Sequence, residues 1–491
     1  MPQNARMRLL ALAAATLALA ADCGGGGGGG GPGGVTITGT VAGTIAIAYD
    51  LNGNEVGRAT ASGTPPAKSF SLALPQGGTY LLFLVENEGT GSQRIYPLYA
   101  DASLATNVFS LREPGTVDLG FVDTTSGNAL PAKNPLFANG VSSAGQSSTI
   151  PVALTTVGTV FSQVDLAGSW ALNGIVATTT SVDWIRALVR IDTSGNSSFD
   201  ELEASFPIGY VESFPMLLSP GGVAWVTEPT LRTFQGFVSG SKDLMVWVMS
   251  IGTAGQALGV MQKLGGEGGS LPGTYRFHQL KGPSVLEPSQ ARSSWARGQL
   301  VVDESLAASV PGASFETSDP GHNTAASYSA RLGFGADGAV TTSDNPTFRG
   351  TLSQGGSTLI ATVTTFAAGP GDLEEHVLLI AQRADAGFEA SELPGTWSLR
   401  EMEVWPRTRV GWSYGKAAID AGADGLRAVL LEVAPEPGPE DPFSVSLSAE
   451  GLVTVNGNGS LLGTLSADRK LLVATSSADD GQTSQLIVLQ R

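Results

Sequence analysis

The chain has 491 residues and a formal net charge of −17, with 14% charged residues and 65 glycines. This length exceeds what one hydrophobic core usually fills, so we expect two to four domains. The 27 Lys and Arg residues are scattered without runs, which argues against the clustered basic surface that nucleic acid requires. Abundant Gly, Ser and Thr favour strands joined by tight turns over helices.

Residues 1–22 have the pattern of a signal peptide. Arg6 and Arg8 precede an apolar run over residues 9–21, which Thr16 alone interrupts. The run is too short to span a bilayer but has the length of a signal-peptide core. We therefore expect export from the cytoplasm.

Cys23 is the only cysteine, which excludes an intrachain disulfide and a thiolate metal cluster. The stretch before it resembles a bacterial lipobox, although Leu19 lies one place further away than usual and Asp22 replaces a small residue. The resemblance implies a lipid on Cys23 that anchors the chain to a membrane of the cell envelope. Gly24 in place of Asp implies the outer membrane. The alternative is a plain secretory signal followed by a chance cysteine.

Glycine occupies every position from 24 to 31, and Pro32, Gly33 and Gly34 follow. Such a segment loses the most backbone entropy on ordering and has no side chain to bury. We expect residues 23–34 to form a lipidated, flexible tether.

Residues 35–123 have the pattern of a small β-sandwich. Residues 35–39 and 68–74 alternate apolar with polar side chains, residues 50–54 have turn composition, and residues 79–85 form a continuous apolar run. This order, ending in Phe-x-Leu-x-Leu-Pro-x-Gly-Gly-Thr-Tyr, resembles the carboxypeptidase regulatory-like, prealbumin-type sandwich. The resemblance implies a spacer or interaction domain without catalytic chemistry.

After a predicted linker at residues 124–164, one set of landmarks occurs three times in the same order. Each copy begins with the motif Leu-x-Gly, which is followed by Ser or Thr and then by Trp or Tyr. Each copy ends with Gln followed by Lys or Arg. The openings lie at 166–170, 271–275 and 393–397, the Trp-led stretches at 184–192, 295–303 and 412–420, the Gly-x-x-Ser segments at 236–239, 350–353 and 463–466, and the closings at 262–263, 382–383 and 490–491. We expect three copies of one fold, at residues 165–264, 270–384 and 392–491.

Each copy has seven or eight candidate strands joined by short turns, which favours an up-and-down barrel without exposed edges. The opening motif resembles the Gly-x-Trp strand of lipocalins and of lipocalin-like bacterial lipoproteins. The predicted fold class is therefore all-β, with an N-terminal β-sandwich followed by three repeated antiparallel β-barrel-like units. Propeller-like blades, two per copy, are the alternative.

The segment Gly411-Trp-Ser413-Tyr-Gly415 matches the Gly-x-Ser-x-Gly nucleophile elbow. An elbow needs a strand, a sharp turn and a helix, yet the equivalent stretches of the other two copies read as plain strands. The histidines also precede Ser413, whereas the general base follows the nucleophile in hydrolases of that fold. We interpret the match as accidental and expect no catalytic residue.

The histidines His278, His322 and His376 lack metal-ligand spacing, and we interpret 374–376 as a solvated strand end. Residues 50–54 resemble the start of a calcium loop but lack the Gly at the sixth place and the acidic residue at the twelfth, so a hairpin turn explains them better. We interpret residues 420–425 as a loop too, with weak calcium binding as the alternative. We therefore expect no metal and no cofactor.

Two sets of aromatic residues recur, Trp170, Tyr275 and Trp397 in the openings and Trp184, Trp295 and Trp412 in the Trp-led stretches. They could line a ligand cavity, but recurrence in every copy favours plugging and packing of the barrel.

The sequence thus predicts a non-enzymatic, membrane-anchored lipoprotein that acts as a structural or interaction module of the cell envelope. Its partner, whether a protein, a glycan or a small apolar ligand, is not specified. A lipocalin-like carrier of a small apolar ligand is the alternative, which an apolar cavity of about 300 Å³ or more within a copy would favour.

Overall fold

The structure is a computed structural model. It describes residues 34–41, 45–50, 55–64, 67–76, 78–88, 94–99, 108–111, 115–125, 128–133, 152–153, 161–206, 213–219, 221–226, 234–251, 255–265, 269–284, 293–319, 328–366, 374–404, 410–422, 425–434, 443–456, 458–477 and 483–491. The helices within these ranges are single 3-10 turns, namely η1 (Gln163–Leu166), η3 (Gly312–Ser314) and η4 (Ala390–Glu392). None of the helices in these ranges has the length and apolar character needed to cross a membrane.

The N-terminal part is a β-sandwich. Its strands are β1 (Val35–Val41), β2 (Ile45–Tyr49), β3 (Glu55–Thr60), β4 (Lys68–Leu74), β5 (Thr79–Glu86), β6 (Arg94–Pro97), β7 (Val108–Leu111), β8 (Gly115–Asp123), β9 (Leu130–Pro131) and β10 (Val152–Ala153). One sheet has the order β4-β1-β8-β9, with β1 and β8 parallel, and the other has the order β10-β7-β5-β2-β3, with β6 on β5. Alternating side chains such as Ile37, Leu72 and Leu82 fill the space between the sheets.

The first repeated unit contains eight strands in one antiparallel sheet. The order is β13-β12-β11-β18-β17-β16-β15-β14. Within the described residues its ends meet at a single bridge between Asn196 and Pro215, so this unit is an incompletely closed barrel. The strands are β11 (Gly168–Ala177), β12 (Val182–Ile191), β13 (Ser197–Ala204), β14 (Met216–Leu218), β15 (Val223–Val226), β16 (Gln235–Val238), β17 (Leu244–Ile251) and β18 (Gly255–Lys263).

The second unit is a closed barrel, because β19 pairs with both β27 and β20. The order is β19-β27-β26-β25-β24-β23-β21-β20, and β22 adds to β20. The strands are β19 (Gly273–Pro283), β20 (Ser294–Val302), β21 (Ala307–Val310), β22 (Glu316–Thr317), β23 (Tyr328–Phe334), β24 (Ala339–Thr342), β25 (Arg349–Leu352), β26 (Thr358–Phe366) and β27 (Glu374–Arg383).

The third unit is also closed, and each strand pairs with the next along the chain. The strands are β28 (Gly395–Val404), β29 (Val410–Gly422), β30 (Gly425–Ala434), β31 (Phe443–Leu447), β32 (Leu452–Val455), β33 (Asn458–Leu465), β34 (Leu471–Ser477) and β35 (Ser484–Gln490). The predicted fold class, a sandwich followed by three barrel-like units, is therefore confirmed, and the propeller alternative is wrong.

Side chains fill the interior of each barrel. The first is packed around Trp170 and Trp247, the second around Tyr275 and the third around Trp397, each within a cluster of other buried apolar residues. Eight-stranded barrels have an interior just wide enough for side chains to fill, which matches this packing.

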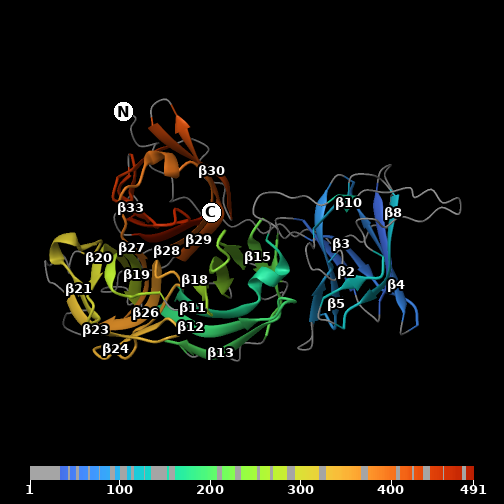
Figure 1. Ribbon diagram of the computed structural model, residues 1–491, viewed down its shortest axis with the longest axis horizontal. Coiled ribbons are helices and arrows are strands. Elements are labelled where there is room, and N and C mark those ends of the chain that lie inside the picture. The colour runs from blue at the N-terminus through green and yellow to red at the C-terminus, as the bar shows by residue number, and fades with distance from the viewer. Residues whose placement is uncertain are drawn as a thin grey trace.

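The three barrels pack against one another in a ring (Figure 1). Strands β11 and β12 of the first barrel contact β26 and β27 of the second, β19 and β20 of the second contact β34 and β35 of the third, and β28 and β29 of the third contact β17 and β18 of the first. Outward-facing apolar residues from all three, such as Val246, Leu378 and Met402, form one shared core. The barrels are therefore a single packed body.

The sandwich docks on the first barrel through its larger sheet. Ile47, Phe83 and Ile95 form one apolar cluster with Leu217 and Trp225. The smaller sheet, β4-β1-β8-β9, lies on the far side of the sandwich and faces away from the barrels (Figure 1).

Candidate functional site

The aromatic residues of the three opening motifs plug the barrels. Trp170, Tyr275 and Trp397 are completely buried. Each ring donates a hydrogen bond to the backbone oxygen of the motif leucine four residues earlier: Trp170 Nε1 to Leu166 at 2.8 Å, Tyr275 Oη to Leu271 at 2.9 Å and Trp397 Nε1 to Leu393 at 3.0 Å. The expectation that these aromatics pack the barrels is confirmed.

The basic residue that closes each copy covers this plug. Lys263, Arg383 and Arg491 lie over the rings of Trp170, Tyr275 and Trp397, at 5.3, 5.6 and 4.1 Å from the ring centroids. The motif glycine makes room for the cation. Gly273, for example, has a φ of +150°, and a Cβ there would lie 2.6 Å from Arg383 Nη2. Opening and closing landmarks thus form one structural unit at one end of each barrel.

The second aromatic set does not plug the barrels, which corrects our expectation. Trp184, Trp295 and Trp412 lie on outer faces and bond to the neighbouring barrel. Trp184 Nε1 donates to Thr364 Oγ1 at 2.8 Å, Trp295 Nε1 to Ser477 Oγ at 2.7 Å, and Trp412 Nε1 to Ser250 Oγ at 2.9 Å. The three bonds run from barrel 1 to 2, from 2 to 3 and from 3 to 1. Sequence periodicity gives no sign of this role, because the partner strands lie far away in the chain.

The residue three positions after each plugging aromatic also bonds to the next barrel. Asn173 Oδ1 accepts a hydrogen bond from Thr362 Oγ1, His278 Nδ1 lies 3.1 Å from Thr475 Oγ1, and Arg400 donates to the backbone oxygens of Gln235 and Gly236. Burial lowers the pKa of His278 to about 3, so this ring is neutral at physiological pH. His278 therefore has a structural role.

Two of the three closing glutamines bond to the neighbouring barrel. Gln262 donates to Thr358 O and Gln382 donates to Leu471 O, each at 3.0 Å. Beside Gln262 is a polar cavity of about 30 Å³ that residues of all three barrels line, among them Asp243, Ser357 and Lys470. This volume suits a single water molecule and is too small for an organic ligand.

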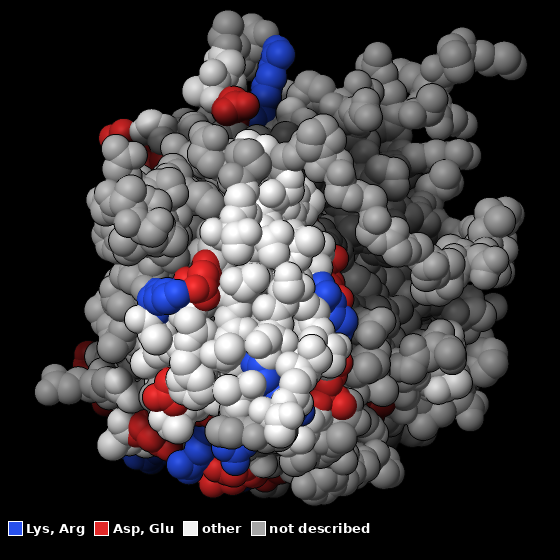
Figure 2. Space-filling view, turned by 90° about the vertical axis from the view of Figure 1, so that its right-hand side faces the viewer, with Lys and Arg blue, Asp and Glu red and all other residues white. Residues whose placement is uncertain are grey.

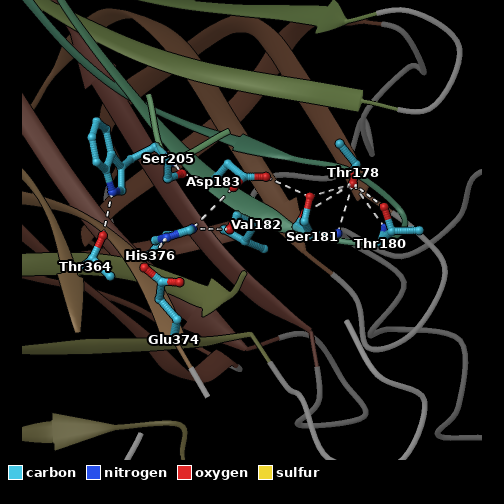
Figure 3. Close-up of polar contacts among 10 residues, drawn as sticks. Thr178, Thr180, Ser181, Val182, Asp183, Ser205, Thr364, Glu374 and His376 are labelled. Carbon is cyan, nitrogen blue, oxygen red and sulfur yellow. Dashed lines mark hydrogen bonds and ion pairs between the residues drawn. The ribbon is translucent and has the colours of Figure 1, made fainter. Parts of the chain in front are cut away.

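A polar cluster around His376 occupies the interface between the first and second barrels. Figure 3 shows His376 of β27 between Val182 and Glu374, with Asp183 of β12 beside it. The ring Nδ1 lies 2.7 Å from Val182 O and 3.4 Å from Asp183 Oδ1, and Nε2 lies 3.7 Å from Glu374 Oε1. His376 is 2% exposed, so the prediction of a solvated strand end is wrong. The outer face of β27 is buried because another barrel covers it.

Hydroxyl groups support the Asp183 carboxylate. Ser181 Oγ donates to Oδ2 at 2.7 Å and Ser205 Oγ donates to Oδ1 at 3.0 Å. Burial lowers the pKa of His376, but the contacts with Asp183 and Val182 raise it more, so the net pKa lies above its ordinary value. Burial raises the pKa of the Asp183 carboxyl, but the contacts with His376 and with these two hydroxyls lower it more, so the net pKa lies below the usual range.

This cluster has the residue types of a Ser-His-Asp site without its geometry. Ser205 donates to Asp183 and not to His376, whereas a nucleophile must bond to the base that takes its proton. Within the described residues, no hydroxyl donates to the ring of His376. We interpret the cluster as a buried interface pair.

Ser413 lies in the middle of β29 and not at a strand-to-helix turn. Its Oγ donates to Glu401 Oε2 at 2.8 Å, and burial raises the pKa of that carboxyl. Ser413 is therefore not placed as a nucleophile elbow requires.

The remaining predicted sites are described in part. Strands β29 and β30 form a hairpin in which Gly422 pairs with Gly425, which agrees with a turn at 420–425. In the described part of the chain, no group of three or more His, Cys, Asp or Glu residues could hold a metal ion. Cys23, His322 and residues 51–54 lie outside the described residues.

A second hollow lies on the smaller sheet of the sandwich, over β1, β4 and β8, and reaches Thr60 at the end of β3. It has a volume of about 540 Å³ and opens to solvent. Most of its lining side chains carry hydroxyls, namely Thr38, Thr40, Thr60, Ser62, Ser69 and Ser71. Asp118 also lines it and forms an ion pair with Lys133, which holds the pKa of Asp118 below its usual range. The hollow is thus polar with its one carboxylate neutralised.

A β-bulge in β8 turns an aromatic ring to the same face. Thr38 pairs with Asp118 and Thr40 pairs with Phe121, so β8 has one extra residue there. Gly120, with a φ of +66°, adopts the left-handed conformation that the bulge requires, and its amide donates to Asp118 Oδ1 at 2.9 Å. Phe121 is consequently 48% exposed, more than any other large apolar side chain in the described ranges.

Uncharged residues dominate this face. Figure 2 shows a broad region of uncharged residues at and above the centre of the view, with charged side chains along its sides and in its lower part. The outward positions of β1 are Thr36, Thr38 and Thr40, and those of β4 include Ser69 and Ser71. For a chain of net charge −17, a neutral hydroxyl-rich face is a distinct feature.

No protein-family model and no curated protein matches this sequence. Among solved structures, transferrin binding protein B of Neisseria meningitidis aligns at 7% identity over 91% of this chain and 86% of its own, with a TM-score of 0.23. A double mutant of transferrin binding protein B from Haemophilus parasuis aligns at 7% identity over 89% and 82%, with a TM-score of 0.22. A DUF3598-family protein of unknown function from Nostoc punctiforme aligns at 11% identity over 45% of this chain and 96% of its own, with a TM-score of 0.19. At such TM-scores the likeness supports no conclusion about a partner.

Proposed function

We propose that the protein is a lipid-anchored interaction module of the bacterial cell envelope, without catalytic activity. In this proposal Cys23 carries the lipid, residues 24–34 are the tether, and the three barrels form a rigid body that holds the sandwich. The packing of the barrels supports this role above all, because their interiors are filled and their outer faces form one shared core. Such a body suits the presentation of a surface better than the enclosure of a ligand.

The filled interiors argue against the carrier alternative. An apolar ligand of ordinary size needs a cavity of about 300 Å³ or more. In the first barrel Trp170, Trp247 and Met261 occupy the interior, and in the third Trp397, Leu426 and Ile487 do so. A carrier would need these side chains to move.

The anchor is tested with the full-length gene in a Gram-negative host grown with labelled palmitate. We expect the wild-type chain to be labelled and recovered with membranes, and Cys23→Ser to be unlabelled and released as a soluble periplasmic protein. Asp22→Gly is the matched control, because it changes the adjacent residue and should keep the label. An unlabelled wild-type chain would contradict the anchor.

The choice between module and carrier is tested on the full chain, purified from membranes in a mild detergent. Solvent extraction and mass spectrometry should find the covalent acyl chains but no apolar molecule in stoichiometric amount. Recovery of one such molecule from the wild-type chain would overturn the module in favour of the carrier.

A further inference from the structure

We propose that the hydroxyl-lined hollow on β1, β4 and β8 binds a neutral oligosaccharide. This inference rests on the proposed interaction role and names the partner class for one surface. The hollow has a volume of about 540 Å³, within the range of sites for small organic ligands. It lies on the sheet that faces away from the barrels, so no other part of the described chain covers it.

The lining chemistry matches the hydroxyls of a sugar. A Ser or Thr hydroxyl both donates and accepts hydrogen bonds, as a sugar hydroxyl does. Thr38, Thr40, Ser69 and Ser71 present such groups from two adjacent strands, and Thr38 lies opposite Ser71 and Thr40 opposite Ser69. The Asp118 carboxylate adds an acceptor. The sheet thus offers a regular grid of donors and acceptors.

The bulge supplies the apolar contact that sugar rings use. Phe121 is about half exposed beside Thr40, at the margin of the hollow. An exposed ring of this kind can stack against the C–H face of a sugar. Without the extra residue in β8, strand alternation would direct this side chain into the sandwich core.

Other ligand classes fit this surface less well. Charged polymers lack a partner, since the ion pair with Lys133 neutralises Asp118. Lipid surfaces require more apolar area than Phe121 provides. An extended peptide would add to a strand edge, but β1 lies between β4 and β8, and Ser69 of the terminal strand β4 already exchanges two backbone hydrogen bonds with Ser62.

The test uses the full chain in detergent, titrated by isothermal calorimetry and saturation-transfer NMR with maltotetraose, cellotetraose, laminaritetraose and chitotetraose. Heparin tetrasaccharide is the anionic comparison, and an extended tetrapeptide is the peptide comparison. We expect at least one neutral tetraose to bind, with affinity reduced about tenfold in Phe121→Ala. Thr38→Val should weaken binding several-fold, because it removes the hydroxyl and keeps the shape.

Thr36→Val is the matched control, since Thr36 faces outward on the same strand but does not line the hollow. Binding should be unchanged in this variant, and melting temperatures should show that all variants are folded. The proposal is overturned if every neutral tetraose fails to bind at millimolar concentration, if only heparin or the peptide binds, or if Phe121→Ala and Thr38→Val bind like wild type. None of these outcomes alters the anchor and extraction tests, so the two proposals fail separately.

Discussion

The indole nitrogen of Trp295 donates a hydrogen bond of 2.7 Å to the hydroxyl of Ser477, which belongs to the next barrel. The same bond recurs from Trp184 to Thr364 and from Trp412 to Ser250, although the paired residues are between 162 and 182 positions apart. Three copies of one fold have thus closed into a ring through equivalent residues.

Trp295→Phe should lower the free energy of unfolding by about 1 kcal/mol, because it removes the hydrogen bond but keeps most of the ring. Urea denaturation of Trp295→Phe, Ser477→Ala and the double variant forms a double-mutant cycle. We expect the two effects to be less than additive. Full additivity would mean that the bond contributes nothing to the interface.

Met402→Ala should destabilise all three barrels together. Met402 is completely buried in the shared core, and truncation of such a side chain costs about 2–5 kcal/mol. We expect one calorimetric transition for the barrels, which this substitution moves as a whole, and faster amide exchange in β17 and β26 as well as in β28. Leu472→Ala, which alters the interior of the third barrel, is the comparison. Separate transitions, with only one moved by Met402→Ala, would show that the barrels unfold independently.

Gly273→Ala should destabilise the chain more than Gly265→Ala, by about 1 kcal/mol. Both glycines have positive φ, at +150° and +107°, so both variants carry backbone strain. Only at Gly273 does the new Cβ displace Arg383 from the plug, since nothing lies within 4 Å of a Cβ at Gly265. Thermal melts of the two variants measure the difference. Equal melting temperatures would show that the Arg383 cover has no energetic role.

His376 should make stability decrease as the pH rises. Its pKa in the folded protein lies above the ordinary value of 6.5, so the stabilisation is complete below pH 6.5 and is lost as the pH rises through the folded pKa. Urea denaturation at a series of pH values should show this loss of stability with rising pH in wild type and not in His376→Gln or Asp183→Asn. If the same loss of stability with rising pH persists in both variants, another titratable group causes it.

His278 should act in the opposite direction. Its folded pKa of about 3 lies below 6.5, so the unfolded chain takes up the proton first and stability falls as the pH drops from 6.5 towards 3. In His278→Gln, which keeps polar atoms near Thr464 and Thr475, this acid-side loss should be smaller. An unchanged pH dependence would contradict a buried neutral imidazole.

Much of each barrel could be predicted from the sequence, because the determining interactions are local. The motif leucine and its aromatic are four residues apart, and the Gly-x-x-Ser segments end in hairpin turns in which Ser239 Oγ accepts the amide of Leu244. The predictions that failed concern the outer faces of the barrels, which are buried between barrels. Continuous apolar strands such as β17 and β35 carry the pattern of burial on both faces, which could have indicated that another unit covers them. The exposure of Phe121 beside the hollow gave no sequence signal, since it depends on one extra residue in β8.

The sequence by itself determined that the chain is all-β, that three copies of one fold follow a sandwich, and that an aromatic residue plugs each copy. These features depend on strand alternation, turns and contacts between residues close along the chain, and such patterns are visible in one sequence. Only the tertiary structure decided that the barrels close into a ring, that His376 is buried against Val182, and that Phe121 borders a hydroxyl-lined hollow. The ring and the burial of His376 depend on surfaces that pack together across more than 160 residues of chain, and no local pattern encodes that pairing. The exposure of Phe121 depends on the register between β1 and β8, which are also far apart in the chain.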